Sequence, residues 1–193
     1  MKRFLVSGAL SALVLAAHAD SSWFQASLTP SVALHPSAAD IRGVAVNVWG
    51  ENVQHGFDLG IIDGSRDQSA GFSLGLVNYD ESYIGLHAGL LNISKDSFIG
   101  LQYGLVNFSR GDFKGWQDGY LINISRGTIT GAQTGYGINV AEDITGAQLG
   151  LVNYAEHLHG VQVGLVNVAL NNGWFDRFPD DLAKGFPIVN WSF

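Results

Sequence analysis

The sequence has no cysteine among its 193 residues, which excludes two kinds of exported protein. Without cysteine there is no disulfide framework and no thiol that could carry a lipid anchor. Lysine and arginine are also scarce, with ten against seventeen aspartates and glutamates. Because nucleic acids are bound by clustered basic side chains, this balance argues against a nucleic-acid partner.

Long apolar runs are missing everywhere except at the beginning of the chain. Residues 1–19 have the basic start, the apolar middle and the small-x-small end (Ala17-His18-Ala19) of a secretory signal peptide. The apolar middle is too short to cross about 30 Å of bilayer as a helix. Glycine and polar residues interrupt every later apolar run, so a membrane location would require a β-barrel. We therefore predict export, followed by one repeat-built β domain at 20–193.

Glycine is abundant, with 25 residues, and it marks an internal repeat. The stretches 146–153 and 160–167 both read G-x-Q-x-G-L-V-N, fourteen residues apart. Such self-similarity at a fixed period indicates a repeat architecture. The first glycines of successive units are spaced by 13 to 16 residues and fall at Gly43, Gly56, Gly71, Gly85, Gly100, Gly115, Gly131, Gly146 and Gly160.

Each unit has the pattern of a β-strand. In the copy at 71–78 the even positions are Phe, Leu, Leu and Asn, while the odd positions after the first glycine are Ser, Gly and Val. Side chains in a strand alternate between two faces, so one face is bulky and apolar and the other small or polar. A helix is a poor alternative, because two glycines per unit would cost roughly 1 kcal/mol each.

Two all-β architectures fit this pattern. In an antiparallel membrane β-barrel of about ten to twelve strands, each unit is one strand plus a short turn, and about ten tilted residues span the apolar band of the outer membrane. In a β-solenoid with coils of 14 to 16 residues, equivalent residues stack on one another. Short polar linkers such as 80–82 favour hairpins and hence the barrel. The longer units at Asn123 and Asn139 would interrupt a stacked ladder, which also favours the barrel.

Two polar rows are the candidate site residues. In a barrel the glutamines would line the lumen, whereas in a solenoid they would form a flat amide-bearing surface; they are Gln102, Gln117, Gln133, Gln148 and Gln162. In a solenoid the asparagines would form an internal hydrogen-bonded ladder; they are Asn78, Asn92, Asn107, Asn153 and Asn167.

The chain ends with alternating apolar residues and a terminal aromatic. Val189, Trp191 and Phe193 share one face of a predicted last strand. This ending resembles the closing strand of bacterial outer-membrane barrels, where it serves as the assembly signal. The resemblance implies the barrel-assembly machinery and outer-membrane lipid as partners.

Side chains that could carry chemistry are present but form no recognisable motif. His157 and His159 lie on one face without a third ligand nearby, so we predict no metal site. Ser73, His87 and the acids Asp80 and Glu81 are loose candidates for a hydrolase, but their spacing fits no catalytic arrangement. We therefore expect neither enzymatic activity nor a cofactor.

The tandem repeats at 146–153 and 160–167, with the ending Asn190-Trp191-Ser192-Phe193, resemble an uncharacterised family of bacterial surface-repeat proteins. The resemblance runs from about Gly43 to the end and implies secretion, but no activity or substrate. The leading hypothesis from the sequence is an outer-membrane barrel with a structural or small-solute pore role. The alternative is an exported solenoid at the cell surface that acts as an adhesin or binding module.

Overall fold

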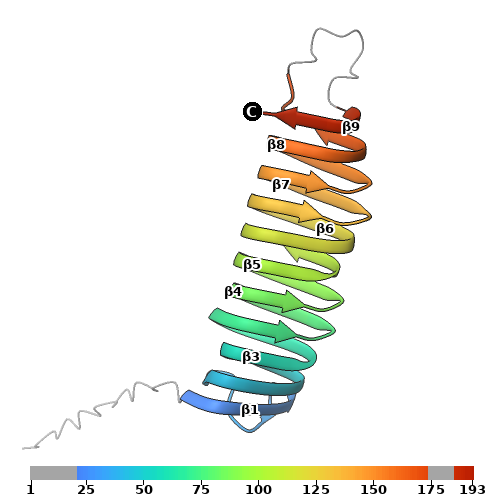
Figure 1. The fold of residues 1–193 in the computed structure, drawn as a ribbon. Helices are drawn as coiled ribbons and strands as arrows, with labels where there is room; N and C mark the ends of the chain where they lie inside the picture. The colour runs from blue at the N-terminus through green and yellow to red at the C-terminus, as the bar shows by residue number, and fades with distance from the viewer. Residues whose placement is uncertain (1–20, 174–184) are drawn as a thin grey trace, which may run out of the picture.

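The strands follow one another up a narrow stack in the computed structural model, which describes residues 21–173 and 185–193 (Figure 1). Several strands run round the corners of the stack, and β3 alone is 35 residues long. Within the described ranges no helix is long and apolar enough to cross a membrane. The strands are β1 (Ser21–Thr29), β2 (Val32–Ala33), β3 (Asp40–Leu74), β4 (Val77–Ala88), β5 (Leu91–Ser109), β6 (Asp112–Thr134), β7 (Ile138–Leu149), β8 (Val152–Ala169) and β9 (Gly185–Ser192).

Neighbouring strands from β3 to β8 pair in parallel, and each residue lies beside the residue one repeat further on. Gly85 pairs with Gly100, and Asn78 pairs with Asn92. One repeat is therefore one coil of a β-solenoid, which confirms the alternative architecture. The prediction of an antiparallel barrel is wrong. The short polar linkers misled it, because a segment such as 80–82 lies inside β4 and rounds a corner of the coil.

Positions in the repeat are counted from its first glycine. A corner at the fifth and sixth positions determines which side chains face inward. At Gly75 and Leu76 the chain bends between β3 and β4. Ser73, before the bend, and Asn78, after it, are both buried, although they are five positions apart. Strict alternation would place them on opposite faces. The predicted grouping of Asn78 with Leu74 and Leu76 was therefore wrong: the leucines point outward and the asparagine points inward.

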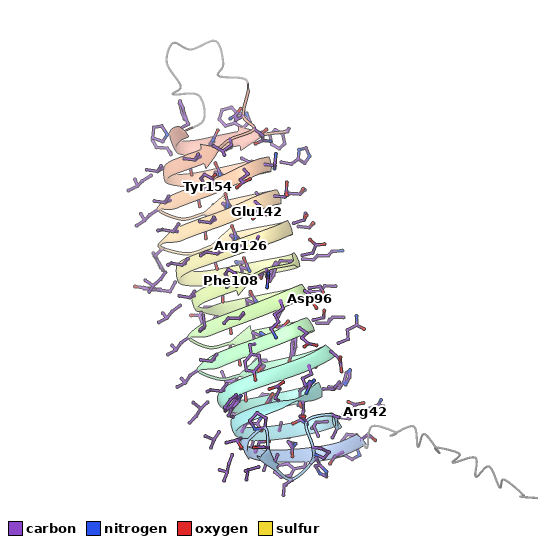
Figure 2. All side chains as sticks on the ribbon, turned by 180° about the vertical axis from the view of Figure 1, so that it is seen from behind. Arg42, Asp96, Phe108, Arg126, Glu142 and Tyr154 are labelled. Atoms are coloured by element: carbon purple, nitrogen blue, oxygen red, sulfur yellow. The ribbon has the colours of Figure 1, made fainter. Side chains whose placement is uncertain are left out.

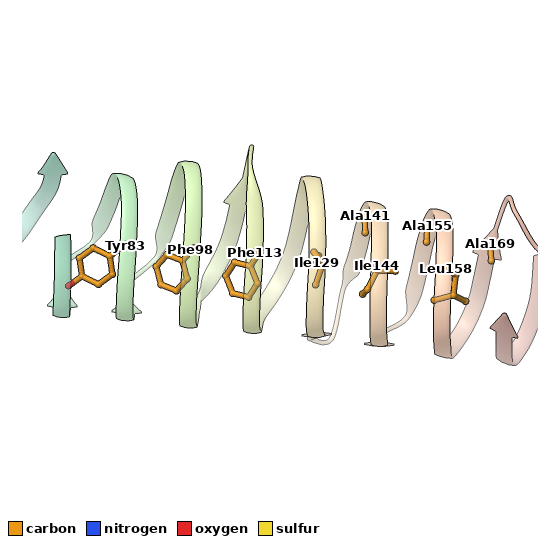
Figure 3. Packing of buried hydrophobic residues seen from close by; sticks show 9 residues of the cluster. All are labelled: Tyr83, Phe98, Phe113, Ile129, Ala141, Ile144, Ala155, Leu158 and Ala169. Atoms are coloured by element: carbon orange, nitrogen blue, oxygen red, sulfur yellow. The ribbon is translucent and has the colours of Figure 1, made fainter. Parts of the chain in front are cut away.

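The interior consists of four rows that run the length of the stack. Two are the asparagine and glutamine rows, and a third begins with small and polar residues and continues as Ala141, Ala155 and Ala169. The fourth is a stack of apolar rings and chains (Figure 3), made of Tyr83, Phe98, Phe113, Ile129, Ile144 and Leu158. Phe98 and Phe113 are stacked with ring centroids 5.3 Å apart. The core thus combines two amide rows, one apolar row and one row that changes from polar to small apolar residues.

The first glycine of each unit is required by its backbone conformation. Gly100 has φ of 140°, a value that favours glycine. A Cβ there would lie 1.9 Å from the carbonyl oxygen of Gly85 in the preceding coil. The same close approach recurs from coil to coil, so this glycine row lets the coils stack at the spacing of a β-sheet.

The two longer units place their extra residue outside the stack. The register between β5 and β6 shifts between Gly104 and Val106: Tyr120 and Leu121 lie opposite the single residue Leu105, and both are exposed. Asn123 and Asn139 stay buried in line with the other asparagines. The expected interruption of the ladder does not occur, because a β-bulge at the corner absorbs the extra residue.

Both ends of the described stack depart from the repeat. At the first end, β2 pairs antiparallel with β1, and Gln25 Nε2 donates to the carbonyl oxygen of His35. At the other end, β9 pairs antiparallel with β8, with Asn190 buried. The predicted signal peptide at 1–19 lies outside the described residues.

The C-terminal residues predicted to close a barrel lie in this last strand. Val189 pairs with Val163, and Trp191 pairs with Val161, while Phe193 is exposed next to His159. β9 therefore covers the last coil and closes no barrel. A role of this segment in assembly stays a prediction.

Candidate functional site: interior ladders and an uncharged outer face

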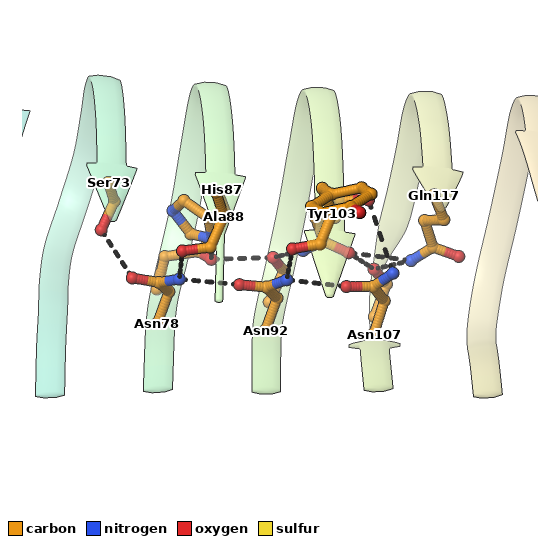
Figure 4. Close-up of polar contacts among 12 residues, drawn as sticks. Ser73, Asn78, His87, Ala88, Asn92, Tyr103, Asn107 and Gln117 are labelled. Atoms are coloured by element: carbon orange, nitrogen blue, oxygen red, sulfur yellow. Dashed lines mark hydrogen bonds and ion pairs between the residues drawn. The ribbon is translucent and has the colours of Figure 1, made fainter. Parts of the chain in front are cut away.

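The asparagine row forms a continuous hydrogen-bonded ladder inside the stack (Figure 4). Asn78 Nδ2 donates to Asn92 Oδ1 at 2.8 Å, and Asn92 Nδ2 donates to Asn107 Oδ1 at 2.7 Å. The series continues through Asn123, Asn139 and Asn153 to Asn167. Every bond has the donor on the N-terminal side. Asn123 and Asn139 belong to this row although their units are one residue longer, so regular spacing did not predict them.

The glutamine row forms a second ladder with the opposite direction. Gln117 Nε2 donates to Gln102 Oε1 at 3.0 Å, and the series continues from Gln133, Gln148 and Gln162, each donating to the residue one coil before it. Because the donors of the two ladders point to opposite ends, their amide dipoles oppose each other along the stack. All five glutamines are fully buried. Both interpretations of this row, a lumen lining and an amide surface, are therefore wrong.

Buried titratable groups cluster in the coils that begin at Gly56, Gly71 and Gly85, where Asp58, Asp63 and His87 stand at amide positions. Asp58, Asp63, Asp80 and His87 are each at most 3% exposed. Asn47 Nδ2 donates to Asp58 at 2.6 Å and to Asp63 at 3.3 Å. Desolvation by burial, followed by the charge of Asp63, raises the pKa of Asp58 to about 9. Desolvation also raises the pKa of Asp63 to about 6, so this pair retains a proton at neutral pH.

The hydrolase candidates Ser73, Asp80 and His87 come together in the same cluster, but inside the stack. Ser73 Oγ donates to Asn78 Oδ1 at 2.8 Å and does not contact the imidazole of His87 within hydrogen-bonding distance. Burial raises the pKa of Asp80 to about 7 and lowers that of His87 to about 3. Although their nearest atoms are 3.6 Å apart, the imidazole is therefore neutral and no ion pair forms. All three side chains are at most 1% exposed.

The two histidines predicted to share a face, His157 and His159, contact different residues. His157 is exposed, and its Nδ1 lies 3.0 Å from Asp143 Oδ1. His159 packs edge-on against the ring of Phe193. Within residues 21–173 and 185–193 no group of three metal-ligating side chains occurs.

The outer surface carries the large apolar side chains, and one face of it has no charge. We call this the LV face: the sixth, seventh and ninth positions of the coils between Ile61 and Val168. Leu76, Leu151 and Leu165 protrude from it, with 52%, 53% and 68% of their surface exposed. Its members include the sixth-position leucines, the seventh-position residues Ile62, Val77, Leu91, Val106, Ile122, Ile138, Val152 and Val166, and the ninth-position residues Tyr79, Ile93, Phe108, Ile124, Val140, Tyr154 and Val168.

Charged side chains collect along the next corner of the coils, at one border of the LV face. In seven consecutive coils the residue that follows the third interior row, the one that continues as Ala141, Ala155 and Ala169, is charged. We call this the margin row: Arg66, Glu81, Lys95, Arg110, Arg126, Glu142 and Glu156. Phe108, Arg126, Glu142 and Tyr154 follow one another up this side of the stack in Figure 2. The guanidinium of Arg126 lies 5.9 Å from the ring centre of Phe108, so the margin row reaches onto the LV face.

The opposite face, at the second and fourth positions, mixes aromatic and polar groups. Phe57 and Phe72 are stacked with ring centroids 5.1 Å apart. Trp116 Nε1 donates to Thr134 Oγ1, whose hydroxyl donates to Asp118. This face therefore carries a carboxylate of its own, whereas the LV face meets one only at its N-terminal border, where the Tyr79 hydroxyl donates to Glu51.

Comparisons with protein-family models, with curated proteins and with solved structures gave no match.

Proposed function

We propose that the protein is an exported β-solenoid held at the cell surface, where it acts as an adhesin or binding module through its LV face. The proposal invokes neither catalysis nor a cofactor. The observation that carries it is the inversion of the usual polarity: the amides are inside, and straight rows of leucine, valine and isoleucine are outside. This surface is what the chain offers to a partner.

The size of the LV face supports a binding role. Eight coils spaced by about 4.8 Å, with about 13 Å of chain along each, give a footprint of about 500 Å². The largest apolar patch of an ordinary monomer is about 300–600 Å² and is often functional. Apolar side chains are also exposed on the other side of the corner, at the fourth position, such as Leu74 and Leu149. Such an area is costly to leave in water, at roughly 25 cal/mol per Å².

The rigid in-register coils support adhesion to a flat partner. Equivalent side chains repeat at the strand spacing, so the leucines form a straight ridge and contact a flat surface together. The interior ladders hold each coil in register with its neighbours. Because the face is already ordered, binding incurs little additional conformational entropy loss.

Adhesion of the exported chain to alkyl-silanised glass, compared with clean glass, tests this function. Beads coated with the chain should adhere to the alkylated surface and detach from clean glass. Substitution of Leu151→Lys together with Leu165→Lys should abolish adhesion, because two charges would then interrupt the ridge. The matched control is Thr130→Lys with Thr145→Lys, which adds the same charge to exposed residues of adjacent coils outside the LV face. Equal adhesion of both double variants would refute the proposal.

A further inference from the structure

The last five charges of the margin row form two blocks of opposite sign. They are positive at Lys95, Arg110 and Arg126 and negative at Glu142 and Glu156, whereas the two earlier members, Arg66 and Glu81, differ in sign. Within the last five coils the sign therefore changes once, between the coils of Arg126 and Glu142. The LV face beside this row carries no charge.

This order is self-complementary under one two-fold rotation. A rotation about an axis that lies in the LV face, parallel to the strands, reverses the order of coils but keeps margin row opposite margin row. With the axis between the coils of Arg126 and Glu142, Arg126 of one copy faces Glu142 of the other. In the same arrangement Arg110 faces Glu156. A shift of the axis by one coil toward the N-terminus instead places Arg110 against Arg126.

The overlap has the area of a weak, reversible contact. Six coils overlap around this axis, from that of Lys95 to that of Leu170, a length of about 29 Å. With about 13 Å of chain across the face, each copy covers about 375 Å², or about 750 Å² in total. Interfaces below about 1,200 Å² are typical of transient complexes. Two-fold dimers are also the commonest oligomers of soluble proteins.

We propose that the LV face binds a second copy of this chain, in a face-to-face two-fold dimer whose register is set by the margin row. The inference rests on the proposed function and names the partner of the same face. On facing cells the same contact would join one cell to another. The apolar rows supply the contact area, and the charges select the arrangement among the many that flat apolar faces allow.

A charge-swap series measured by sedimentation of the exported chain tests the dimer and its register. The wild type should sediment as a dimer without detergent. Arg110→Glu and Glu156→Arg should each raise the dissociation constant by about tenfold, since each creates two like-charge contacts per dimer. The double variant should restore the wild-type constant. Residues 110 and 156 are three coils apart within one chain, about 14 Å, so restoration must come from contacts between copies.

Lys114→Glu is the matched control, because it reverses an exposed charge four residues from Arg110 but outside the LV face. It should leave the dissociation constant unchanged. A wild type that stays monomeric at all concentrations overturns the dimer, and a double variant no tighter than the single variants overturns its register. Neither result affects adhesion to alkylated glass, so the proposed function would stand or fall separately.

Discussion

Asp63 occupies the asparagine position of its repeat, and replacing it by asparagine should stabilise the fold. Asp63 pairs with Asn78, the first amide of the ladder. Asp63 Oδ2 has the same position in its coil as Asn78 Nδ2 has in the next one, because each lies against the fifth-position glycine of the following coil. A Cβ on Gly75 would lie 2.6 Å from Asp63 Oδ2, and a Cβ on Gly89 would lie 2.7 Å from Asn78 Nδ2. The carboxylate oxygen thus occupies the place of a ladder donor, where it has no hydrogen-bond partner. Asp63→Asn places an N–H there and extends the ladder by one coil.

The magnitude follows from the charge and from the new hydrogen bond. Burial raises the pKa of Asp63 from 3.8 to about 6 in the folded chain. Each pKa unit corresponds to 1.36 kcal/mol, so ionisation of this side chain costs the fold about 3 kcal/mol. The added ladder bond contributes about 1 kcal/mol more. Together these effects should raise the melting temperature by roughly 8–16 °C at pH 8.

The pH dependence separates the two contributions. The pKa of Asp63 is higher in the folded than in the unfolded chain, so this group lowers stability as pH rises from about 4 to about 6, and the loss is complete above that. Asp63→Asn should therefore stabilise by about 4 kcal/mol at pH 8 but only by about 1 kcal/mol below pH 4.

Urea unfolding followed by far-ultraviolet circular dichroism at both pH values measures this difference. Asp96→Asn, which removes an exposed carboxylate, is the control and should change stability little. A variant less stable than the wild type at pH 8, or an equal gain at both pH values, would refute this reasoning.

The remaining predictions concern the glycine row, the ladder and Asp80. Gly100→Ala should prevent folding, because its Cβ would meet the carbonyl oxygen of Gly85, while Gly185→Ala, whose Cβ meets nothing closer than 3.8 Å, should be tolerated; the soluble yield and melting curve decide this. Asn107→Ala should cost about 2–4 kcal/mol in urea unfolding, because it leaves neighbouring buried amides without partners, and a loss below 1 kcal/mol would show that the ladder is dispensable. Asp80→Ser should flatten the loss of stability between pH 4 and pH 7, since burial raises the pKa of this carboxyl to about 7; an unchanged slope would assign it to other groups.

The sequence predicted the unit and its outer polarity, but not the way in which units join. The period, the glycines and the strand character all follow from local pattern, and the leucines of the sixth position are exposed as expected. A barrel and a solenoid share these features, because each presents one face of a strand outward. The distinction depends on whether neighbours are parallel, which a short linker such as 80–82 does not reveal when it rounds a corner inside a coil.

The candidate site was harder to predict, because the alternation of side chains between the two faces is interrupted at the corner. Uninterrupted alternation would place Asn78 with the leucines, and only the bend at Gly75 and Leu76 brings it to face Ser73. The extra residues of the longer units bulge outward at the same corner, which sequence spacing alone could not distinguish from a change of face. The buried acids were visible in the sequence, since Asp58 and Asp63 stand in the glutamine and asparagine positions.

The interior ladders also explain why the repeat pattern changes at the C-terminal end of the described stack. An amide in a ladder donates to one neighbour and accepts from the other, so the last member at each end has an unpaired group unless something else supplies a partner. Asn190 in β9 donates to Gln162 Oε1 at 3.3 Å and so ends the glutamine row. Asn167 Nδ2 donates to the carbonyl oxygen of Phe186 and ends the asparagine row. An antiparallel strand can satisfy both rows at once, because it lies across the last coil without presenting another copy of the repeat to solvent.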